Sequence, residues 1–548
     1  MSSRQLLENT ARNYFGYLAR SFPVMSASDE FDFLPRSEEA DKYYDRLENL
    51  GQKKVEEHIY NLRDFRNEFR SMMELNNDLS SRIDLELLEA NINGALIELE
   101  HVKSWKHNPL LYLKIAFIGL DHSLTKPFST IKVVQERFRT RLSEIPRLLK
   151  QGVENLENIP ESYHRAALAM VADAKEYLEG ILGDPKIHSI PDIFEQFEKV
   201  TTSLNQFRKF LQSLKPVPDG QINVSTFEYR VKKHFAVQRP LDEIFELAKD
   251  EWERVLRKLQ KVARTIQPGK TWQEIYREYN PFDTFFDIHF LYGNEIAQLR
   301  EHLRESDFLE YFPDRVLELC ETPTYLRSVR SSASFSAPFS SDPREKAYFY
   351  ITSRKFDGNK KVHDEVLKRL HKEYRFLTAH ETYPGHHLLD TFRRESSNLI
   401  RRQIESPLFY EGWAYYAESI PIETGYIEDP VEILVDLKRQ LWRSARCQID
   451  VGLATGRLRR EEAVELLRFV NFSKEEALAQ VNRFGLNPGY QLCYSLGRYE
   501  INRLRKKYEP VLGARMFHQV LLKGGELPFH LADLNLKHSS ETHRKHIT

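Results

Sequence analysis

The sequence contains little cysteine and no excess of either charge. Its 548 residues include three scattered cysteines, Cys320, Cys447 and Cys493, and this odd number argues against a disulfide framework. The 80 lysines and arginines are balanced by 81 aspartates and glutamates, which gives a net charge of -1. Proteins that bind nucleic acids usually carry a basic surface, and this composition gives no indication of one.

Long apolar runs are also missing. No window reaches the roughly 18 uninterrupted apolar residues that indicate a membrane span. The segment from Met1 to Arg20 carries charges throughout, and it lacks the apolar core and the small-residue cleavage site of an export signal. Together with the scarce cysteines, this predicts a cytoplasmic protein that binds no membrane. The sequence leaves the oligomeric state open.

Glycine and proline are sparse for this length, at 22 and 24 residues, and charged residues alternate with leucine, isoleucine and phenylalanine. This composition predicts a soluble, mainly α-helical protein with enough residues for one large or two moderate domains. Apolar residues recur at helical spacing in several segments. One such series is Leu85, Leu88, Ile92, Leu96 and Leu99.

The linker and the strand signals are few. Residues 215–220, Lys-Pro-Val-Pro-Asp-Gly, form the clearest linker and predict an N-terminal helical half, 1–215, and a C-terminal half, 216–548, unless the two form one continuous domain. Residues 347–352, Ala-Tyr-Phe-Tyr-Ile-Thr, have the composition of a strand. It could be an edge on which an extended peptide pairs its backbone, or an ordinary hairpin strand, and the residues leave both open.

The segment from His380 to His387, His-Glu-Thr-Tyr-Pro-Gly-His-His, is a stretched form of the zinc-hydrolase helix signature. In that signature, two histidines at i and i+4 hold the ion and the glutamate after the first activates water. Here His386 would lie about 9 Å along a regular helix from His380, and on another face. Pro384 and Gly385 supply the irregularity that could bring a second imidazole back to one ion.

A third ligand is predicted in the segment Tyr-Glu-Gly-Trp-Ala-Tyr-Tyr-Ala-Glu, residues 410–418. Glu411 follows His386 by 25 residues, which leaves room for a helix end, a connection and the start of a second helix. We expect Gly412 to let this second helix approach the first closely. Glu418 lies two turns on and on the same face, so we predict that it contacts a ligand or solvent instead of the ion.

A late segment, 487–498, opens a further helix after a Pro-Gly turn. Tyr490 and Tyr494 share one face of this helix, at i and i+4. A tyrosine hydroxyl beside a metal can donate to the oxyanion of a tetrahedral intermediate. The same two residues could equally pack in the core, since the chain contains 26 tyrosines.

These motifs, in this order, resemble the family known as domain of unknown function 885. They are His-Glu-x-x-Pro-Gly-His-His, Glu-Gly-Trp-Ala and Pro-Gly…Tyr-x-x-Gly. Weaker similarity covers most of the chain. The resemblance implies a zinc metallopeptidase with an α-helical fold akin to neurolysin, a deep cleft between two helical halves, and a small edge hairpin near the active site.

The resemblance also assigns roles to residues. Glu411 resembles the second-helix glutamate of the gluzincins, and the Gly-His ending of related two-helix motifs favours His386 over His387 as a zinc ligand. Tyr494 becomes the predicted oxyanion donor. The remaining predicted contacts of the substrate or of the ligands are His387, Glu418, Tyr490 and Arg498.

Two positions depart from the family pattern. Tyr490 stands between the late Pro-Gly and Gln491, which the pattern places side by side. Ala454 stands where the Asp-x-Gly-Leu segment usually ends in histidine. If that histidine contacts the substrate, this protein has a shifted specificity or a reduced activity.

The leading hypothesis is a zinc-dependent peptidase that hydrolyses short peptides. Zn²⁺ would be held by His380, His386 and Glu411, with Glu381 as the general base and Tyr494 as the oxyanion donor. A zinc amidohydrolase of a non-peptide small molecule would use the same residues. The third hypothesis is a catalytically degenerate peptidase scaffold used for binding, for which Ala454 is the sequence support.

Overall fold

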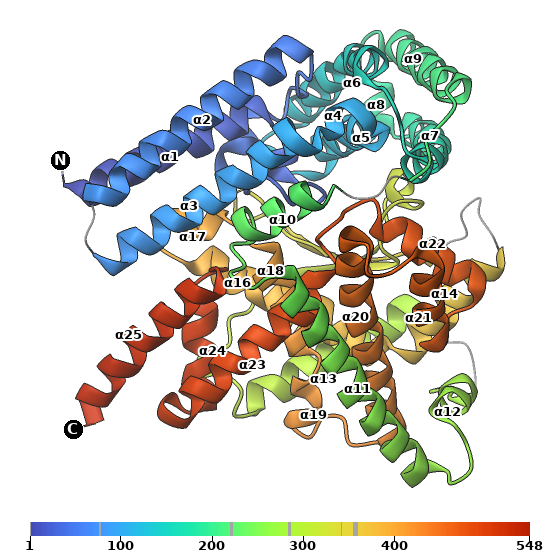
Figure 1. Ribbon diagram of the computed structural model, residues 1–548. Helices are drawn as coiled ribbons and strands as arrows, with labels where there is room; N and C mark the ends of the chain where they lie inside the picture. The colour runs from blue at the N-terminus through green and yellow to red at the C-terminus, as the bar shows by residue number, and fades with distance from the viewer. Residues whose placement is uncertain are drawn as a thin grey trace. The chain divides into compact units, whose positions relative to one another are not determined.

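The computed structural model describes residues 2–75, 78–219, 223–282, 287–340, 342–353 and 360–547, and it is mainly helical, as predicted (Figure 1). The chain forms two compact units. The first comprises Met1–Gly220, Glu321–Ser332 and Ser336–Ala347, and the second comprises Gln221–Cys320, Ala333–Phe335 and Tyr348–Thr548. The division predicted at the linker 215–220 does not include the two segments after residue 320 that belong to the first unit.

The first unit is built from amphipathic helices around an apolar one. The central helix, α5, has leucine, isoleucine and phenylalanine on all sides and is buried over most of its length. The helix α6 packs against α5 and α9 through one buried apolar face. The helices of this unit are α1 (Ser3–Ser21), α2 (Gln52–Leu75), α3 (Leu79–Ile97), α4 (Ser104–His107), α5 (Pro109–Thr125), α6 (Ile131–Asn155), α7 (Glu161–Leu182), α8 (Pro185–His188) and α9 (Ile193–Ser213).

The second unit holds the segments with the predicted motifs. Its first ten helices are α10 (Val224–Lys233), α11 (Leu241–Ile266), α12 (Trp272–Glu278), α13 (Ile288–Glu305), α14 (Lys360–Lys372), α15 (Tyr374–Glu381), α16 (His386–Glu395), α17 (Leu399–Gln403), α18 (Pro407–Ala417) and α19 (Ile420–Glu423). The last six are α20 (Pro430–Thr455), α21 (Arg460–Phe469), α22 (Lys474–Phe484), α23 (Leu492–Leu512), α24 (Ala514–Lys523) and α25 (Phe529–Ile547).

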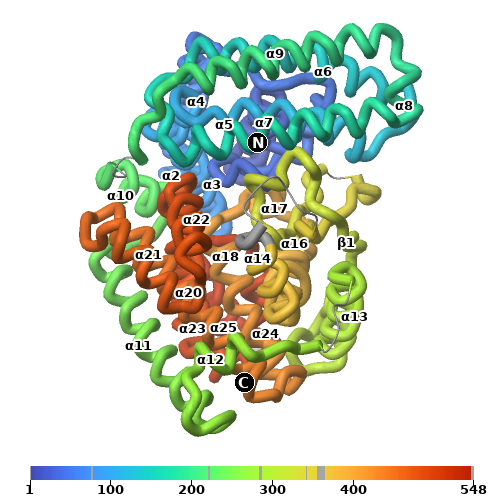
Figure 2. The backbone as a smooth tube through the Cα atoms, turned by 90° about the vertical axis from the view of Figure 1, so that its right-hand side faces the viewer, coloured from blue at the N-terminus to red at the C-terminus, as the bar shows by residue number. Residues whose placement is uncertain are grey.

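Two helix pairs organise this unit. The long helices α11 and α20 lie side by side, with Val255, Leu259 and Ala263 of α11 in one apolar cluster with Leu441 and Ala445 of α20 (Figure 1). The short helices α21 and α22 pack together beside α20 (Figure 2). The other of the two organising pairs is α18 with α23, and it carries two of the predicted motifs. None of the described helices is long and apolar enough to cross a bilayer.

The pair α18 and α23 depends on two glycines. A Cβ atom added to Gly412 would lie 2.5 Å from the Cα atom of Gly497, so neither position has room for a side chain. Gly412 therefore lets α18 approach α23. The close approach was predicted for the helix of His380 instead, because the sequence does not show which helix the glycine faces.

A small sheet accompanies these helices. Its strands are β1 (Leu317–Glu321), β2 (Ala333–Ser336) and β3 (Ala347–Ile351), in the order β1-β3-β2. The predicted strand, β3, lies in the middle of the sheet, which excludes the edge alternative that the sequence left open for 347–352. Phe349 and Ile351 of β3 are buried against Tyr292 of α13 and Leu370 of α14, and β2 is one of the two edges.

We predict that Gly412→Ala destabilises the protein by about 1–3 kcal/mol, the usual effect of overpacking, because the added methyl group meets the backbone of α23. The matched control is Gly293→Ala in α13, where the exposed Cβ would come no closer than 4.0 Å to Leu319. Helix propensity makes this control neutral or stabilising by up to about 1 kcal/mol. Thermal unfolding of both variants measures the difference, and equal midpoints would contradict the assigned contact.

Candidate metal site

The two predicted histidine ligands lie on different helices. The helix α15 ends at Glu381 and α16 begins at His386, so the Pro-Gly pair separates two helices instead of kinking one. A Cβ atom at Gly385 would lie 1.9 Å from the carbonyl oxygen of His380, which only glycine can allow. The Tyr383-Pro384 peptide bond is cis. This turn brings the rings of His380 and His386 to a centroid separation of 4.8 Å.

His380, His386 and Glu411 form one buried group that could hold a metal ion. One ligand atom from each lies within 4.8 Å of the others. The Oε2 atom of Glu411 lies 3.5 Å from Nε2 of His380 and 3.6 Å from Nε2 of His386. These distances are long for hydrogen bonds. They match the roughly 3.3 Å between neighbouring ligands of a tetrahedral ion with bonds of about 2.0–2.1 Å.

The polar atoms of this group fit a cation. Among the described residues, Oε2 of Glu411 is buried and accepts no hydrogen bond. Burial raises the pKa of Glu411, but the neighbouring His380 and His386 hold it well below its usual value, so the carboxylate is charged. A buried charged oxygen that faces two imidazole nitrogens is a donor set that could hold a metal ion.

The other oxygen of Glu411 is held by the two predicted tyrosines. The hydroxyl of Tyr490 donates to Oε1 at 2.6 Å, and that of Tyr494 donates to the same atom at 2.8 Å. These bonds turn Oε2 toward the histidines. Tyr494 lies at the start of α23, so the glycine contact between α18 and α23 also brings the tyrosine to the glutamate.

His380 is fixed by a buried carboxylate. Its Nδ1 atom lies 2.8 Å from Oε1 of Glu418, so the N–H of this nitrogen donates there and Nε2 is the nitrogen that faces Glu411. Arg439 holds both oxygens of Glu418 at 2.9 Å, and Arg443 contacts Oε1. Burial raises the pKa of Glu418, but the lowering by Arg439 and Arg443 is larger. The pKa therefore lies below its usual value, and this carboxylate stays ionised.

The structure brings His386 and not His387 into the group. The Nε2 atom of His387 lies 3.1 Å from the hydroxyl of Tyr383 and 3.2 Å from the carbonyl oxygen of Arg315. His386 stacks on the ring of Tyr410 at a centroid separation of 3.7 Å. His387 therefore supports the turn, because its imidazole contacts Tyr383 and Arg315 instead of Glu411.

Glu381 lies beside the group and is positioned by the sheet. Its Oε2 atom accepts a hydrogen bond of 2.7 Å from the backbone N–H of Phe335 in β2. Burial is the main influence on its pKa, and His380 and His386 offset it in part, with the result that the pKa is raised. The carboxylate therefore takes up a proton more readily than the carboxylate of an exposed glutamate does.

Two predicted positions lie apart from the group. Arg498 places its guanidinium over the ring of Tyr415, 4.4 Å from the centroid, and is not among the contacts of Glu411 or the histidines. Ala454 is buried near the end of α20. Gln491 accepts two hydrogen bonds from Arg446 of α20, at 2.9 and 2.6 Å.

Two cations of α20 that support the site were not predicted from the sequence. Arg439 and Arg443 lie one turn apart and are fully or almost fully buried. The available signal was a repeat of basic residues at helical spacing between apolar residues of one helix, because basic residues that become buried need acidic partners. Their partner, Glu418, belongs to another helix segment, which no spacing rule could identify.

The fold and this group define a mainly helical protein with a buried His-His-Glu site that could hold a metal ion. The chain belongs to the family described as bacterial protein of unknown function (DUF885), whose model matches residues 36–534. No curated protein matches the chain.

Two solved structures share the fold. One is the putative lipoprotein from Colwellia psychrerythraea, at a TM-score of 0.77 and 17% identity, covering 99% of this chain and 100% of that one. The other is a putative lipoprotein of unknown function from Shewanella oneidensis, at a TM-score of 0.74 and 17% identity, covering 97% of this chain and 99% of that one. At this identity the likeness establishes the fold alone.

These structures correct the predicted cytoplasmic location, which is wrong on this comparison. Both relatives are described as lipoproteins, a class that is attached to a membrane by lipid. The prediction depended on scarce cysteines and on a charged first segment. Neither the scarcity of cysteine nor the charge of the first segment determines the location of a helical protein without disulfides.

We predict that His386→Ala and His387→Ala differ in metal affinity. Loss of His386 removes one of three ligand atoms and should weaken Zn²⁺ binding by more than the roughly 10- to 100-fold that follows loss of an outer partner. His387→Ala should keep the ion, because His387 contacts Tyr383 and Arg315. Competition with a chelating dye measures both. Loss of zinc in the His387 variant alone would contradict the assignment.

We also predict that Tyr490→Phe combined with Tyr494→Phe lowers Zn²⁺ affinity by roughly 10- to 100-fold, because Oε1 of Glu411 loses both hydroxyl donors. Each single variant should lose less, since one donor remains. Tyr499→Phe, 40% exposed on the same helix, serves as the control. Unchanged affinity in the double variant would show that the tyrosines do not hold the ligand.

Proposed function

We propose that this protein is a zinc-dependent metallopeptidase that hydrolyses short peptides. The observation that carries the proposal is the buried group of His380, His386 and Glu411 with Glu381 directly beside it in the chain and in space. A metal site with a structural role needs no additional carboxylate of raised pKa at its side. The gluzincin type and the neurolysin-like cleft implied by the family resemblance stay predictions.

Zinc bound by His380, His386 and Glu411 would supply a Lewis acid that polarises the scissile carbonyl and lowers the pKa of water. Glu381 takes the proton of the attacking water and delivers it to the leaving amine, for which its raised pKa is suited. The N–H of Phe335 holds one oxygen of Glu381, and the other oxygen is the one that exchanges the proton.

Tyr494 is the proposed donor to the oxyanion. Burial raises its pKa, so the hydroxyl keeps its proton and remains a donor. Tyr490 donates to the same oxygen of Glu411, so Tyr494 can turn toward the substrate without releasing that carboxylate. The guanidinium of Arg446 lies over the ring of Tyr494, 3.8 Å from the centroid. This contact holds the plane of the ring, and with it the direction in which the hydroxyl points.

The edge strand supports a peptide as the substrate. The strand β2 lies at the edge of the sheet, and its Phe335 contacts Glu381 through the backbone. An extended peptide that adds to this edge would bring a carbonyl group close to the general base. The names of the two structural relatives support a membrane-anchored location outside the cytoplasm.

We predict that Glu381→Gln retains about one equivalent of zinc and lowers peptide hydrolysis by at least the roughly 10²- to 10⁴-fold contribution of a general base. Glu428→Gln, on the exposed segment after α19, is the control. Metal analysis measures the first quantity, and mass spectrometry of a digested peptide library measures the second.

The other hypotheses give different outcomes in the same experiment. Turnover of small amides without peptide cleavage would indicate an amidohydrolase. A zinc-loaded wild type that binds peptides tightly but cleaves none would indicate the degenerate scaffold suggested by Ala454. A folded protein that binds no added zinc would contradict both zinc hypotheses.

A further inference from the structure

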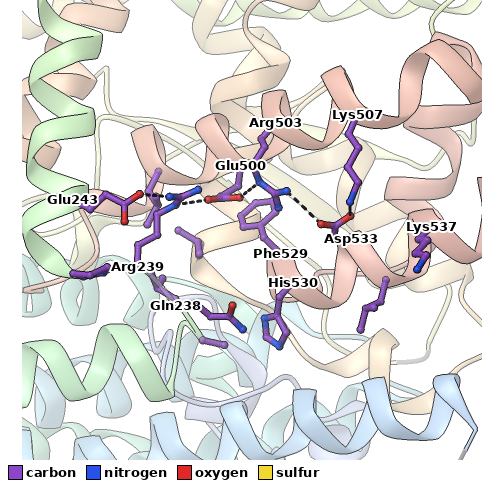
Figure 3. A pocket seen from close by; sticks show the side chains of 16 residues that line it. Gln238, Arg239, Glu243, Glu500, Arg503, Lys507, Phe529, His530, Asp533 and Lys537 are labelled. Carbon is purple, nitrogen blue, oxygen red and sulfur yellow. Dashed lines mark hydrogen bonds and ion pairs between the residues drawn. The ribbon is translucent and has the colours of Figure 1, made fainter.

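Two cavities of the second unit lie outside the metal site, and their charges differ in balance. The larger, about 580 Å³, has its main charges paired (Figure 3). Arg239 and Arg503 both contact Glu500, and Asp533 accepts from Arg503 and Lys507. Because these acidic and basic side chains form ion pairs with one another, this cavity has little unpaired charge that would attract a charged ligand.

The second cavity, about 440 Å³, is strongly basic. Its lining includes five cationic residues and two acidic ones. The cations are Arg277, Lys368, Arg369, Lys372 and Lys438, and the acids are Glu365 and Glu476. Of the five cations, Lys438 is paired with Glu373 at 2.8 Å, and Arg369 is paired with Glu476.

Lys372 carries a charge that its contacts do not neutralise. Its ammonium donates to the backbone carbonyls of Tyr276 and Arg277 at 2.8 and 2.7 Å, which use two of its three hydrogens and supply no negative charge. Burial, with Lys438 and Lys368 nearby, lowers the pKa of Lys372 to about 8. Positive charge is therefore crowded at this point.

Lys368 adds a second available charge. It lies one turn before Lys372 on α14, on the same face, and is exposed. Within the described part of the chain, it forms no ion pair, and Glu365 accepts instead from the hydroxyl of Ser473 at 2.7 Å. A ligand in the cavity can therefore meet both lysines without displacing an internal carboxylate.

Two of the cations that line the cavity lie against aromatic rings. Lys438 is 1% exposed, and its ammonium lies 4.7 Å from the ring centroid of Tyr276 and 4.8 Å from that of Phe472. Arg369 also lies over Phe472, at 5.3 Å. These ring contacts hold the two paired cations in place, and Lys368 and Lys372 add the unpaired positive charge of the lining.

We propose that this cavity binds a small oxyanion, a phosphate or polycarboxylate compound, through Lys368 and Lys372, with Lys438 and Arg369 as further cations of the lining. Ammonium and guanidinium groups form their strongest hydrogen bonds with such oxygens. A volume of about 440 Å³ accommodates a small organic ligand as well as an inorganic ion. This inference does not depend on peptidase activity, since no proposed metal ligand lines the cavity.

The test is calorimetric titration of the full-length protein with inorganic phosphate and, separately, with citrate at matched ionic strength. We expect saturable binding of at least one of them at one site, and the preferred anion identifies the phosphate or the carboxylate class. Lys368→Gln combined with Lys372→Gln should weaken that binding at least tenfold. Lys537→Gln, in the cavity of Figure 3, is the matched control and should bind as the wild type does.

Lys368→Gln alone keeps the test decisive if the double variant does not fold, because Lys368 is exposed and its loss should weaken binding several-fold. Circular dichroism establishes that each variant is folded. Heats that do not saturate, or equal affinities in the wild type and the folded Lys368 variant, would overturn the proposal and leave the cavity as a solvated basic surface.

Discussion

A buried chain of ion pairs holds the metal-site region together. His380 is tied to Glu418, Glu418 to Arg439, and Arg439 to Glu373, where Nη1 of the arginine lies 2.6 Å from a carboxylate oxygen. Arg439 is fully buried, and both glutamates are 1% exposed. Since an unpaired charge in such a place costs several kcal/mol, the three helix segments that carry these residues can take up only positions in which every partner is present.

This constraint explains why the site can use an unusual spacing. The turn at Gly385 separates α15 from α16, and a free chain could adopt many arrangements at such a break. Glu418 fixes one histidine, and the hydrogen bond of 2.9 Å from Trp413 to the carbonyl of Pro384 fixes the turn itself. The second imidazole then has one position, beside Tyr410. The widened motif is therefore compatible with a single ion because α18 supports it at several points.

The sequence predicted what is local. Helical spacing predicted the fold class, and the histidines and Glu411 stood out because their residue types and order resemble known metal motifs. What is not local could not be predicted. The Ala-Ser-Phe-Ser strand β2 has weak strand propensity, and its role follows from one backbone bond to Glu381, 46 residues away. The contact of Gly412 with Gly497 and the pairing of Arg439 with Glu418 likewise depend on tertiary packing.

The same chain of ion pairs reaches the basic cavity, because Glu373 accepts from both Arg439 and Lys438. Lys438 lines the cavity, and Arg439 contacts the glutamate that orients His380. An oxyanion bound beside Lys438 would compete with Glu373 for its hydrogen bonds, and Glu373 would then interact more strongly with Arg439. If this alters the affinity for a metal ion, thermodynamic linkage requires that the metal alters the affinity for the oxyanion by the same factor. Ion pairs of Glu373 therefore connect the two proposed sites, and any coupling between them has the same magnitude in both directions.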